Sequence, residues 1–514
     1  MNKKKYIEFI YLIILGIVTS FSLSPFNYFI INFLTFTLFY LFLIKRIDQH
    51  KNISLFFFYG WLFGFGYFIS SLYWISISLT YDENFKFLIP LAVILIPAFL
   101  ALFYGLITFF FLILKPKKII SSFLIFSLIF GVVEFIRGTI LTGFPWNLII
   151  YSLSQQKEFL SITSIIGTYG LNLFCISLFT SPAIMLLGDA KKILEFFILF
   201  LITVIFFYSY GHYNKEKFYG SNTKIYEYKL RIIGSNISLD RFYQKTDPFS
   251  VIEDLIILSN PSESEKTIFI WPEGILPNDE LEKFVKIKSL IEKNFSENHF
   301  LIIGTNKKST DGEFEKYFNS LSIYNNKFEL IDSYDKINLV PFGEFLPFEN
   351  ILKAFGFKSL TNNYQSFSKG EVREVIEINQ QNFSLKFLPL ICYEIIYSGK
   401  LFDKSNYDLI INISEDGWFG KSIGPKQHFD HSILRAIESG KYIIRSSNNG
   451  IAAIVNPLGI IEKSVDFGES GYVELNEIKI VQPTIFSKYG NKIFGLLILM
   501  YILLIFSFNR IKNE

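Results

Sequence analysis

The chain has 514 residues, of which 51% are hydrophobic, 18% aromatic and 18% charged, and its formal net charge is +3. It is too apolar for a wholly soluble protein and too polar for one that lies entirely in lipid, so we expect a membrane part and a water-facing part. The small net charge gives no reason to expect a nucleic-acid partner, and two cysteines are too few for a disulfide framework.

Eight apolar runs reach or approach the roughly 20 residues needed to cross a bilayer core. The first follows a basic start and could be a signal peptide, but it lacks a small-x-small cleavage site and more runs follow, so we interpret it as an uncleaved helix. The runs are Tyr6–Ser22, Tyr28–Ile44, Leu55–Leu79, Phe87–Leu114, Ile119–Ile136, Ile162–Leu187, Ile193–Tyr210 and Ile493–Phe508. We therefore expect a polytopic α-helical membrane domain over residues 1–212, with seven spans, and a C-terminal transmembrane helix over residues 490–509.

Basic residues fall in alternate loops between these runs. They are Lys3–Lys5, Lys45, Arg46, Lys51, Lys115, Lys117, Lys118, Lys191 and Lys192, with Arg510 and Lys512 at the end of the chain. The positive-inside rule then predicts that both termini are cytoplasmic and that the long segment after Tyr210 lies outside, in the periplasm or its equivalent.

One predicted outer loop carries the sequence Gly-Phe-Pro-Trp-Asn at 143–147, after Glu134 and Arg137. Those two charged residues are three apart and can pair on one helix face. A tryptophan such as Trp146 at a membrane edge is usually an interfacial anchor. The functional alternative is a contact with a lipid headgroup at the mouth of a site.

From about Lys229 to Ile480 short β-branched and aromatic runs alternate with helical ones, which indicates one layered α/β domain, placed at residues 225–485. The predicted strands are Leu230–Ile237, Thr267–Trp271, Phe300–Gly304, Asn319–Tyr324, Leu385–Ile391, Leu409–Ile413, Tyr442–Ser446 and Ile451–Asn456. The predicted helices are Pro248–Leu258, Asp279–Asn294 and His428–Ser439.

Three polar motifs follow predicted strands in this domain: Trp-Pro-Glu-Gly at 271–274, Tyr-Asp-Lys at 334–336 followed by Pro-Phe-Gly-Glu at 341–344, and Cys-Tyr-Glu at 392–394. Taken singly, a strand-end glutamate is usually solvated, a lone lysine lies at the surface, and a free cysteine is a small core residue. Together they supply a base, a cation and a nucleophile at loop positions of a rigid scaffold.

These side-chain types are sufficient for acyl transfer without a histidine. A thiol attacks a carbonyl as the thiolate, and a nearby carboxylate can take its proton. An ammonium such as Lys336 can neutralise the resulting oxyanion, and Glu344 could orient that lysine and keep it protonated. His428 and His431 are three apart, but no third ligand stands at a suitable spacing, so we favour ordinary polar roles and expect no metal.

Glu273, Lys336 and Cys392, in this order and within these motifs, resemble the Glu-Lys-Cys triad of the carbon–nitrogen hydrolase (nitrilase) superfamily. The segments 339–347 (Leu-Val-Pro-Phe-Gly-Glu-Phe-Leu-Pro), 418–420 (Trp-Phe-Gly), 422–425, 435–438 and 445–450 are similar to the apolipoprotein N-acyltransferase family, which adds a membrane half. The resemblance covers nearly the whole chain and implies an αββα sandwich, nitrilase-like, on the extracytoplasmic side of a bacterial inner membrane.

The resemblance also implies an enzyme, a membrane acyltransferase of lipoprotein biosynthesis that needs no cofactor. A phospholipid donor would acylate Cys392 as a thioester, and the amine of a diacylated apolipoprotein would accept the chain, with Glu273 as base and acid and Lys336 on the oxyanion. Glu344, Tyr393 and Glu394 would support the site. Trp418 and Phe419 would lie on a mobile loop near the lipid entrance and, with Trp146, contact substrate; core packing is the alternative for the Trp-Phe pair.

One departure from the family pattern concerns the residue two positions before Gly417. The family usually has Asn-Asp there, whereas this chain has Glu415-Asp416. An additional carboxylate could alter the hydrogen bonds of the loop or the acceptor preference, but it leaves the triad intact.

Two other functions remain open at this point. A membrane-tethered amidase or nitrilase-type hydrolase would use the same triad and pass the acyl group to water. A transporter or scaffold would only bind, and would be expected to carry ionisable residues within its spans, of which the seven N-terminal runs have few.

Overall fold

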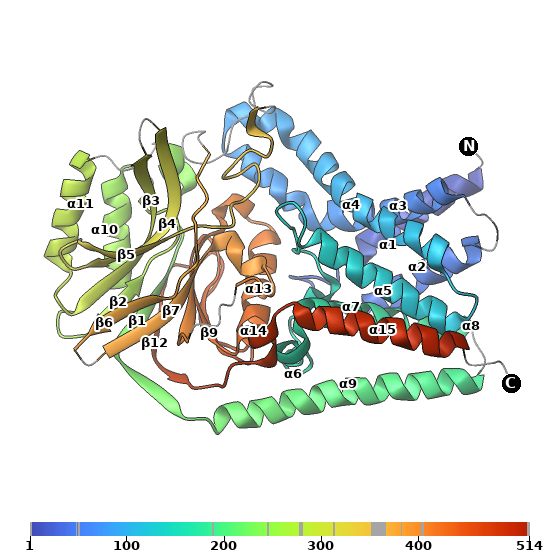
Figure 1. The fold of residues 1–514 in the computed structure, drawn as a ribbon. Coiled ribbons are helices and arrows are strands. Elements are labelled where there is room, and N and C mark those ends of the chain that lie inside the picture. Colours follow the sequence, from blue (N-terminus) through green and yellow to red (C-terminus); the bar gives the residue numbers. More distant parts are fainter. Residues whose placement is uncertain are drawn as a thin grey trace.

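The computed structural model describes the whole chain except residues 1–2, 48, 50–51, 188–189, 244–245, 277–280, 312–313, 351–365, 382, 402–405 and 511–514. Two parts lie side by side (Figure 1): a bundle of helices, called the helical half, and a β-sheet with flanking helices between Thr223 and Lys479, called the sheet domain. Of the expected basic positions, Lys51 and Lys512 lie outside the described residues.

The helical half contains long apolar helices joined by short turns. Its elements are α1 (Lys3–Ser20), α2 (Ile31–Ile47), α3 (Ile53–Leu72), η1 (Tyr73–Thr80), η2 (Glu83–Leu88), α4 (Ile89–Leu114), α5 (Ile119–Arg137), η3 (Ile149–Leu153), α6 (Lys157–Leu160), α7 (Thr163–Thr180), α8 (Pro182–Leu187), α9 (Ala190–Tyr219), α14 (Ile485–Tyr489) and α15 (Lys492–Arg510). Within the described residues, five stretches are long and apolar enough to cross a membrane: Ile53–Thr80, Glu83–Leu114, Ile119–Arg137, Thr163–Leu187 and Lys492–Arg510.

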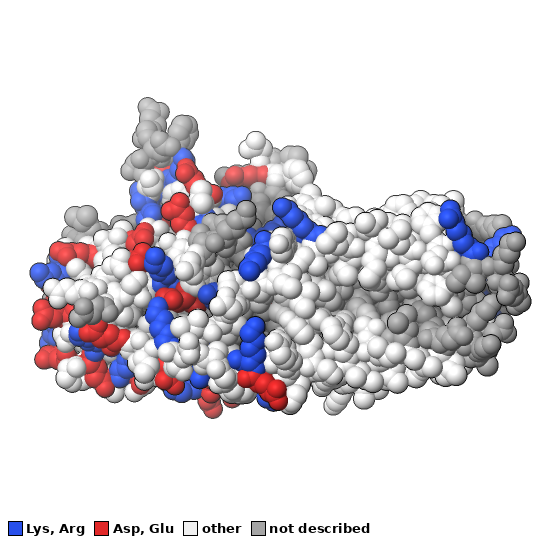
Figure 2. Space-filling view, turned by 60° about the horizontal axis from the view of Figure 1, so that its bottom comes forward, with Lys and Arg blue, Asp and Glu red and all other residues white. Residues whose placement is uncertain are grey.

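The surface of the helical half matches this composition. Figure 2 shows a broad face without charged side chains over the helices, with basic residues towards its far end, whereas acidic and basic residues crowd the sheet domain. Both chain ends lie at the end of the helical half away from the sheet domain (Figure 1). The chain is therefore a membrane protein with a polar domain at one end of its helices.

The sheet domain is built on one connected sheet of twelve strands, with the order β5-β4-β3-β2-β1-β9-β8-β7-β6 along its main path. The strands are β1 (Thr223–Ser235), β2 (Thr267–Ile270), β3 (His299–Asp311), β4 (Phe314–Asn325), β5 (Leu330–Asp335), β6 (Ile376–Gln380), β7 (Phe383–Ile391), β8 (Leu409–Glu415), β9 (Tyr442–Asn448), β10 (Ala452–Val455), β11 (Ile461–Val465) and β12 (Gly471–Lys479). The central strands β1, β2 and β3, and likewise β7, β8 and β9, run parallel.

The two halves of this sheet pack against each other. A single apolar cluster joins Leu230, Ile268 and Ile302 of the first half to Leu385 and Ile411 of the second. The outer face of the first half is covered by α10 (Pro248–Ser259) and α11 (Leu281–Asn294), and that of the second by α13 (Gly424–Ser439). The order helix, sheet, sheet, helix is the layered α/β arrangement that the alternating sequence pattern predicts.

The predicted strands and helices of this domain are all present, with shifted ends. The helix expected from Asp279 begins at Leu281 among the described residues. Four further strands among the described residues, β5, β6, β11 and β12, were not predicted, because each has exposed positions and lacks a continuous apolar run.

The helical half and the sheet domain share one apolar core, which includes Phe36 and Tyr104 of the helices and Leu390 and Ile433 of the sheet domain. Polar contacts cross the same boundary. The Glu438 carboxylate on α13 accepts hydrogen bonds from the Thr168 amide (2.7 Å) and hydroxyl (2.6 Å) on α7. The sheet domain is thus fixed rigidly to the helices beside it.

Candidate active site

Strand ends at one edge of the sheet place the predicted site residues. Glu273 comes three residues after the end of β2, Cys392 follows β7 directly, and Lys336 follows β5. Because β2 and β7 lie in parallel sets, their carboxyl ends open towards the same edge, where ligand sites of α/β sheets form. The structure brings these three side chains together into one buried charged cluster.

The centre of the cluster is an ammonium between two carboxylates. The Lys336 Nζ atom lies 3.2 Å from Glu273 Oε1 and 2.9 Å from Glu344 Oε1. Burial by itself would lower the pKa of Lys336, but the charges of Glu273 and Glu344 raise it well above its usual range. The lysine therefore remains a cation, as expected for a group that stabilises an oxyanion.

A residue that the sequence analysis did not single out completes this centre. The Asn319 side-chain amide, in the middle of β4, donates hydrogen bonds of 2.7 Å to Glu273 Oε1 and to Glu344 Oε1. A polar residue at the head of the predicted strand Asn319–Tyr324 was the available signal. With its two N–H groups, Asn319 holds both carboxylates around the same ammonium.

Cys392 has a backbone conformation that turns the chain sharply. Its φ of 47° lies in the left-handed region, which is rare for a non-glycine residue and is often found at functional sites. Burial raises the pKa of the Cys392 thiol well above its usual range, and the charge of Glu273 raises it further, while Lys336 lowers it. The resting sulfur is therefore protonated, and its attack on a carbonyl requires a base.

Glu394 is committed to hydrogen bonds and is not available as that base. Its carboxylate accepts bonds from the backbone amides of Ile337 (3.1 Å), Asn338 (3.1 Å) and Ile391 (2.9 Å). Tyr334 and Arg373 donate to it as well, at 2.8 and 2.5 Å. Glu394 thereby ties the segment that carries Lys336 to the strand that carries Cys392, which is a supporting role.

Tyr393 connects the cysteine turn to the helical half. Its hydroxyl donates to the Gly143 carbonyl at 3.2 Å, and the nearby Tyr397 hydroxyl donates to the Thr142 carbonyl at 2.9 Å. The predicted pair of Glu134 and Arg137 forms in the last turn of α5, and Arg137 also donates to the Phe144 carbonyl. The loop at 142–147 is thus held between the helical half and the turn of Cys392.

The three aromatic residues predicted to contact substrate all lie where the sheet domain meets the helical half. Trp418 is half-buried, with its ring 5.3 Å from that of Phe242. The Phe419 ring lies 4.7 Å from that of Trp74 in η1. Trp146 is only 3% exposed and stacks on His428 at 5.2 Å, so it lies inside the boundary between the two halves of the molecule rather than on an outer surface.

His428 belongs to a second polar group beside Cys392. Its Nδ1 atom lies 2.8 Å from Asp416 Oδ1, and Arg445 Nη2 lies 2.8 Å from Asp416 Oδ2. Ligand atoms of Cys392, Asp416 and His428 lie within 4.8 Å of one another, which is close enough for a metal site. The Arg445 guanidinium already neutralises Asp416 there and would repel a second cation, so we assign no metal to this group.

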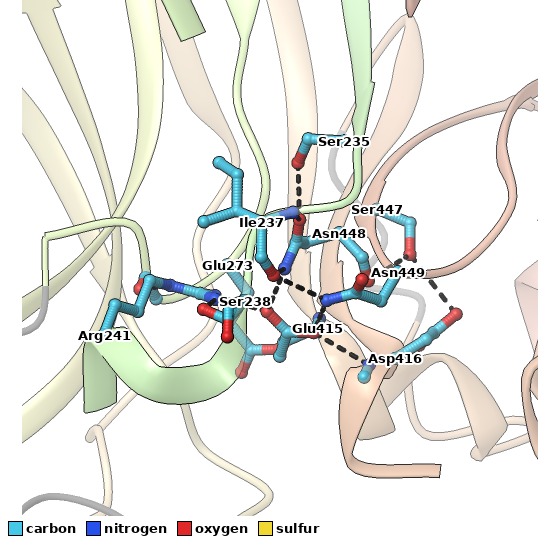
Figure 3. A network of polar contacts seen from close by, with 12 residues as sticks. Ser235, Ile237, Ser238, Arg241, Glu273, Glu415, Asp416, Ser447, Asn448 and Asn449 are labelled. Carbon is cyan, nitrogen blue, oxygen red and sulfur yellow. Dashed lines mark hydrogen bonds and ion pairs between the residues drawn. The ribbon is translucent and has the colours of Figure 1, made fainter. Parts of the chain in front are cut away.

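Glu415, the residue that departs from the family pattern, has a buried partner. Its carboxylate pairs with Arg241 and accepts hydrogen bonds from the Gly417 amide (2.8 Å) and from Asn448 Nδ2 (2.7 Å), as Figure 3 shows. Burial raises the pKa of Glu415, and Arg241 acts in the opposite direction. The extra carboxylate is therefore compensated within the domain instead of standing free in the loop.

Comparisons with known proteins cover both halves of the chain. Residues 15–180 match the family model of the apolipoprotein N-acyltransferase N-terminal domain, and residues 265–480 match that of carbon-nitrogen hydrolase. The apolipoprotein N-acyltransferase of Rickettsia prowazekii is 36% identical over 519 residues, which cover 98% of each chain. That of Rhodopseudomonas palustris is 30% identical and covers 95% of this chain and 93% of its own.

A solved structure is similar to half of this chain at lower identity. A mutant of the amidase from Nesterenkonia sp. AN1 is 12% identical, covers 50% of this chain and 91% of its own, and has a TM-score of 0.34. The matches of sequence over nearly the full length, and not this likeness, determine the family.

Proposed function

The chain belongs to the apolipoprotein N-acyltransferase family, and we propose that it N-acylates lipoproteins through a thioester on Cys392, with a phospholipid as acyl donor. The acceptor is the N-terminal amine of a diacylglyceryl-cysteine, and the product is a mature, triacylated lipoprotein. The observation that carries the mechanism is the buried contact of Lys336 with Glu273 (3.2 Å) at the strand edge where Cys392 turns the chain.

In the first step Glu273 takes the proton of the Cys392 thiol while the sulfur attacks the ester carbonyl of the phospholipid. The ammonium of Lys336 neutralises the oxyanion of the tetrahedral intermediate. When the intermediate collapses, the carbon–oxygen bond breaks, Glu273 returns the proton to the leaving alkoxide, and a lysophospholipid departs. The acyl group remains on the sulfur as a thioester.

In the second step the amine of the diacylated cysteine attacks the thioester carbonyl. Glu273 accepts a proton from the amine, Lys336 again balances the oxyanion, and the carbon–sulfur bond breaks to give an amide. The proton held by Glu273 returns to the sulfur, so the enzyme is regenerated. Neither step needs a cofactor or a metal.

The proposed topology follows from the position of the chain ends. The eight apolar runs form a membrane domain at residues 1–212 and a C-terminal transmembrane helix at residues 490–509, with the catalytic domain at 225–485 between them. The positive-inside rule predicts cytoplasmic termini. Because both ends of the chain lie at the end of the helices away from the sheet domain (Figure 1), the catalytic domain would then lie on the periplasmic side of the inner membrane. The site then opens beside the outer leaflet, where both lipid substrates have their reacting atoms.

The supporting and substrate-contacting roles are part of the same proposal. Glu344 keeps Lys336 charged, and Glu394 and Tyr393 fix the two turns of the site. Trp418 and Phe419 sit beside η1 of the helical half, where an acyl chain would enter from the bilayer. Trp146 lies behind them and would shape the inner wall of that entrance.

Product analysis tests the function directly. The purified protein is incubated with a phospholipid labelled in its acyl chain, with and without a diacylated lipopeptide that has a free N-terminal amine. We expect label in the lipopeptide amide and little free fatty acid in either reaction. Release of labelled fatty acid at the same rate with or without the lipopeptide would instead assign a hydrolase.

A further inference from the structure

A buried ion pair lies behind Glu273, on the side away from Lys336. Arg241 belongs to η4 (Leu239–Tyr243), and Glu415 is the last residue of β8. Their side chains are 2% and 1% exposed. The two residues are far apart in the sequence, and the fold brings them together beside the first residue of the proposed triad (Figure 3).

Glu415 touches Glu273 through its backbone. The Glu415 amide N–H donates a 2.9 Å hydrogen bond to Glu273 Oε2, whereas Oε1 of the same carboxylate faces Lys336 and Asn319. The Glu415 carboxylate folds back onto the Gly417 amide two residues on, so the side chain fixes the turn that begins at the N–H bound to Glu273.

Arg241 reaches the other side of Glu273. Its Nε atom donates to the carbonyl of Gly274, the residue after Glu273, at 3.1 Å, and its Nη1 atom donates to the Ser238 carbonyl at 3.0 Å. Gly274 has a φ of 65°, so the backbone turns sharply just beyond Glu273. The Arg241 guanidinium thus connects the turn at Gly274 with the Glu415 carboxylate. Glu415 is the residue whose N–H binds Glu273.

Stability alone is a poor reason for this arrangement. Removing two charges from water costs several kcal/mol for each ion, and well-packed apolar residues often stabilise a protein as well as a buried ion pair does. What the pair adds is direction, because the rigid fork of Arg241 fixes two backbone segments in one geometry. Misplacement of a catalytic group by about 1 Å can cost about 100-fold in rate.

We propose that Arg241 and Glu415 form a positioning unit that holds the Glu273 carboxylate in line for proton transfer with Cys392. The proposal rests on the role given above to Glu273 as the base. Their side chains act on Glu273 through the Glu415 N–H, the Gly274 carbonyl and the balance of charge next to Glu273.

The charge balance gives a readout that a merely structural role would not produce. In Glu415→Gln the guanidinium of Arg241 is left unpaired close to Glu273, which favours the carboxylate form and makes it a weaker base. The acid limb of the pH–rate profile, where the base gains its proton, then moves to lower pH. In the double variant Arg241→Gln/Glu415→Gln both charges are gone, and the limb returns towards its wild-type position.

The test measures the rate at which Cys392 is acylated by a phospholipid, followed by mass spectrometry of the full-length protein in detergent from pH 5 to 9. The matched control is Arg231→Gln. Arg231 is also buried. It pairs with the carboxylates of Glu474 and Glu265 and donates to the backbone carbonyls of Ser259 and Asn260, and none of these described partners belongs to the site.

We expect Glu415→Gln to acylate about 10- to 100-fold more slowly than wild type, with its acid limb about one pH unit lower. The control should keep the wild-type limb even where it unfolds at a lower temperature. An unshifted limb in Glu415→Gln, or an equal shift in Arg231→Gln, would overturn the proposal. If Glu415→Gln does not fold, Glu415→Asp takes its place, because it keeps the negative charge but moves the carboxylate away from Arg241. Slow acylation by Glu415→Asp with an unshifted acid limb supports the proposal. Acylation at the wild-type rate overturns it.

Failure of the proposed function has a different signature in the same experiment. If the wild-type protein forms no acyl adduct on Cys392, the thioester mechanism is wrong whatever the variants do. If the wild type is acylated and the variants of Arg241 and Glu415 behave like Arg231→Gln, only the positioning role is wrong.

Discussion

Replacement of Asn319 by leucine is the most revealing single change at the site. The side chains are similar in size, but leucine cannot donate the two 2.7 Å hydrogen bonds that Asn319 gives to Glu273 and Glu344. Glu273 would then be held by Lys336 and the Glu415 N–H, and Glu344 by Lys336 and the Val340 N–H. We expect slower acylation of Cys392, because Glu273 is less well oriented and the two carboxylates repel each other more strongly.

The geometry gives a magnitude for this loss. A hydrogen bond to a charged group contributes about 1.5–3 kcal/mol, so the two bonds of Asn319 together contribute about 3–6 kcal/mol. If half of the larger figure is lost in the transition state of acylation, the barrier rises by about 3 kcal/mol and the rate falls about 100-fold. The remainder appears as a lower free energy of unfolding.

The assay combines single-turnover acylation by phospholipid with thermal unfolding. The matched control is Asn456→Leu, since Asn456 is also buried and its amide donates to a carboxylate, that of Glu462 at 2.9 Å, in a turn outside the site. The control should lose stability and keep the acylation rate of its folded fraction. Wild-type acylation by a folded Asn319→Leu would refute the reasoning about how Glu273 is held.

Three further results are expected. The rate of Cys392 alkylation by iodoacetamide should still rise with pH above pH 9, because the raised pKa of the thiol keeps the sulfur protonated past the usual range. A rate that levels off near pH 8.5, about the ordinary pKa of a thiol, would contradict this. Lys336→Met should slow that alkylation at a fixed pH, since the lysine lowers the pKa of the thiol, and equal or faster labelling would argue against their proximity. Glu394→Gln should lower the melting temperature and the acylation rate together, because it weakens the ion pair with Arg373 and the hydrogen bonds that join the segments of Lys336 and Cys392. Calorimetry and the acylation assay check this, and an unchanged melting temperature would count against it.

Part of the proposed active-site cluster could be located from the sequence because two of its residues follow buried apolar strands. Glu273 stands just beyond β2 and Cys392 just beyond β7, and parallel strands bring their carboxyl ends to one edge, whereas Lys336 was singled out only by its motif. The same logic could not find β5 and β12, whose exposed faces carry polar residues and lack the apolar run that marks a buried strand.

The contacts that hold the cluster together could not be predicted from the sequence, because they join segments that are far apart along the chain. Nothing local marks Asn319 as the partner of two glutamates, or Arg241 as the partner of Glu415. Trp146 shows the same limit: its place in the chain is typical of an interfacial residue, yet its ring stacks on His428 inside the boundary between the two halves. Such pairs are set by tertiary packing, which no local pattern encodes.

The central claim is that a phospholipid acyl group is carried on the sulfur of Cys392. Mass spectrometry of the intact protein after exposure to phospholipid, without acceptor, measures this directly. The account predicts an acyl adduct on the peptide that contains Cys392, absent from Cys392→Ala and discharged by a diacylated lipopeptide. Transfer of the acyl group to the lipopeptide by Cys392→Ala, or an adduct on any other residue, would contradict it.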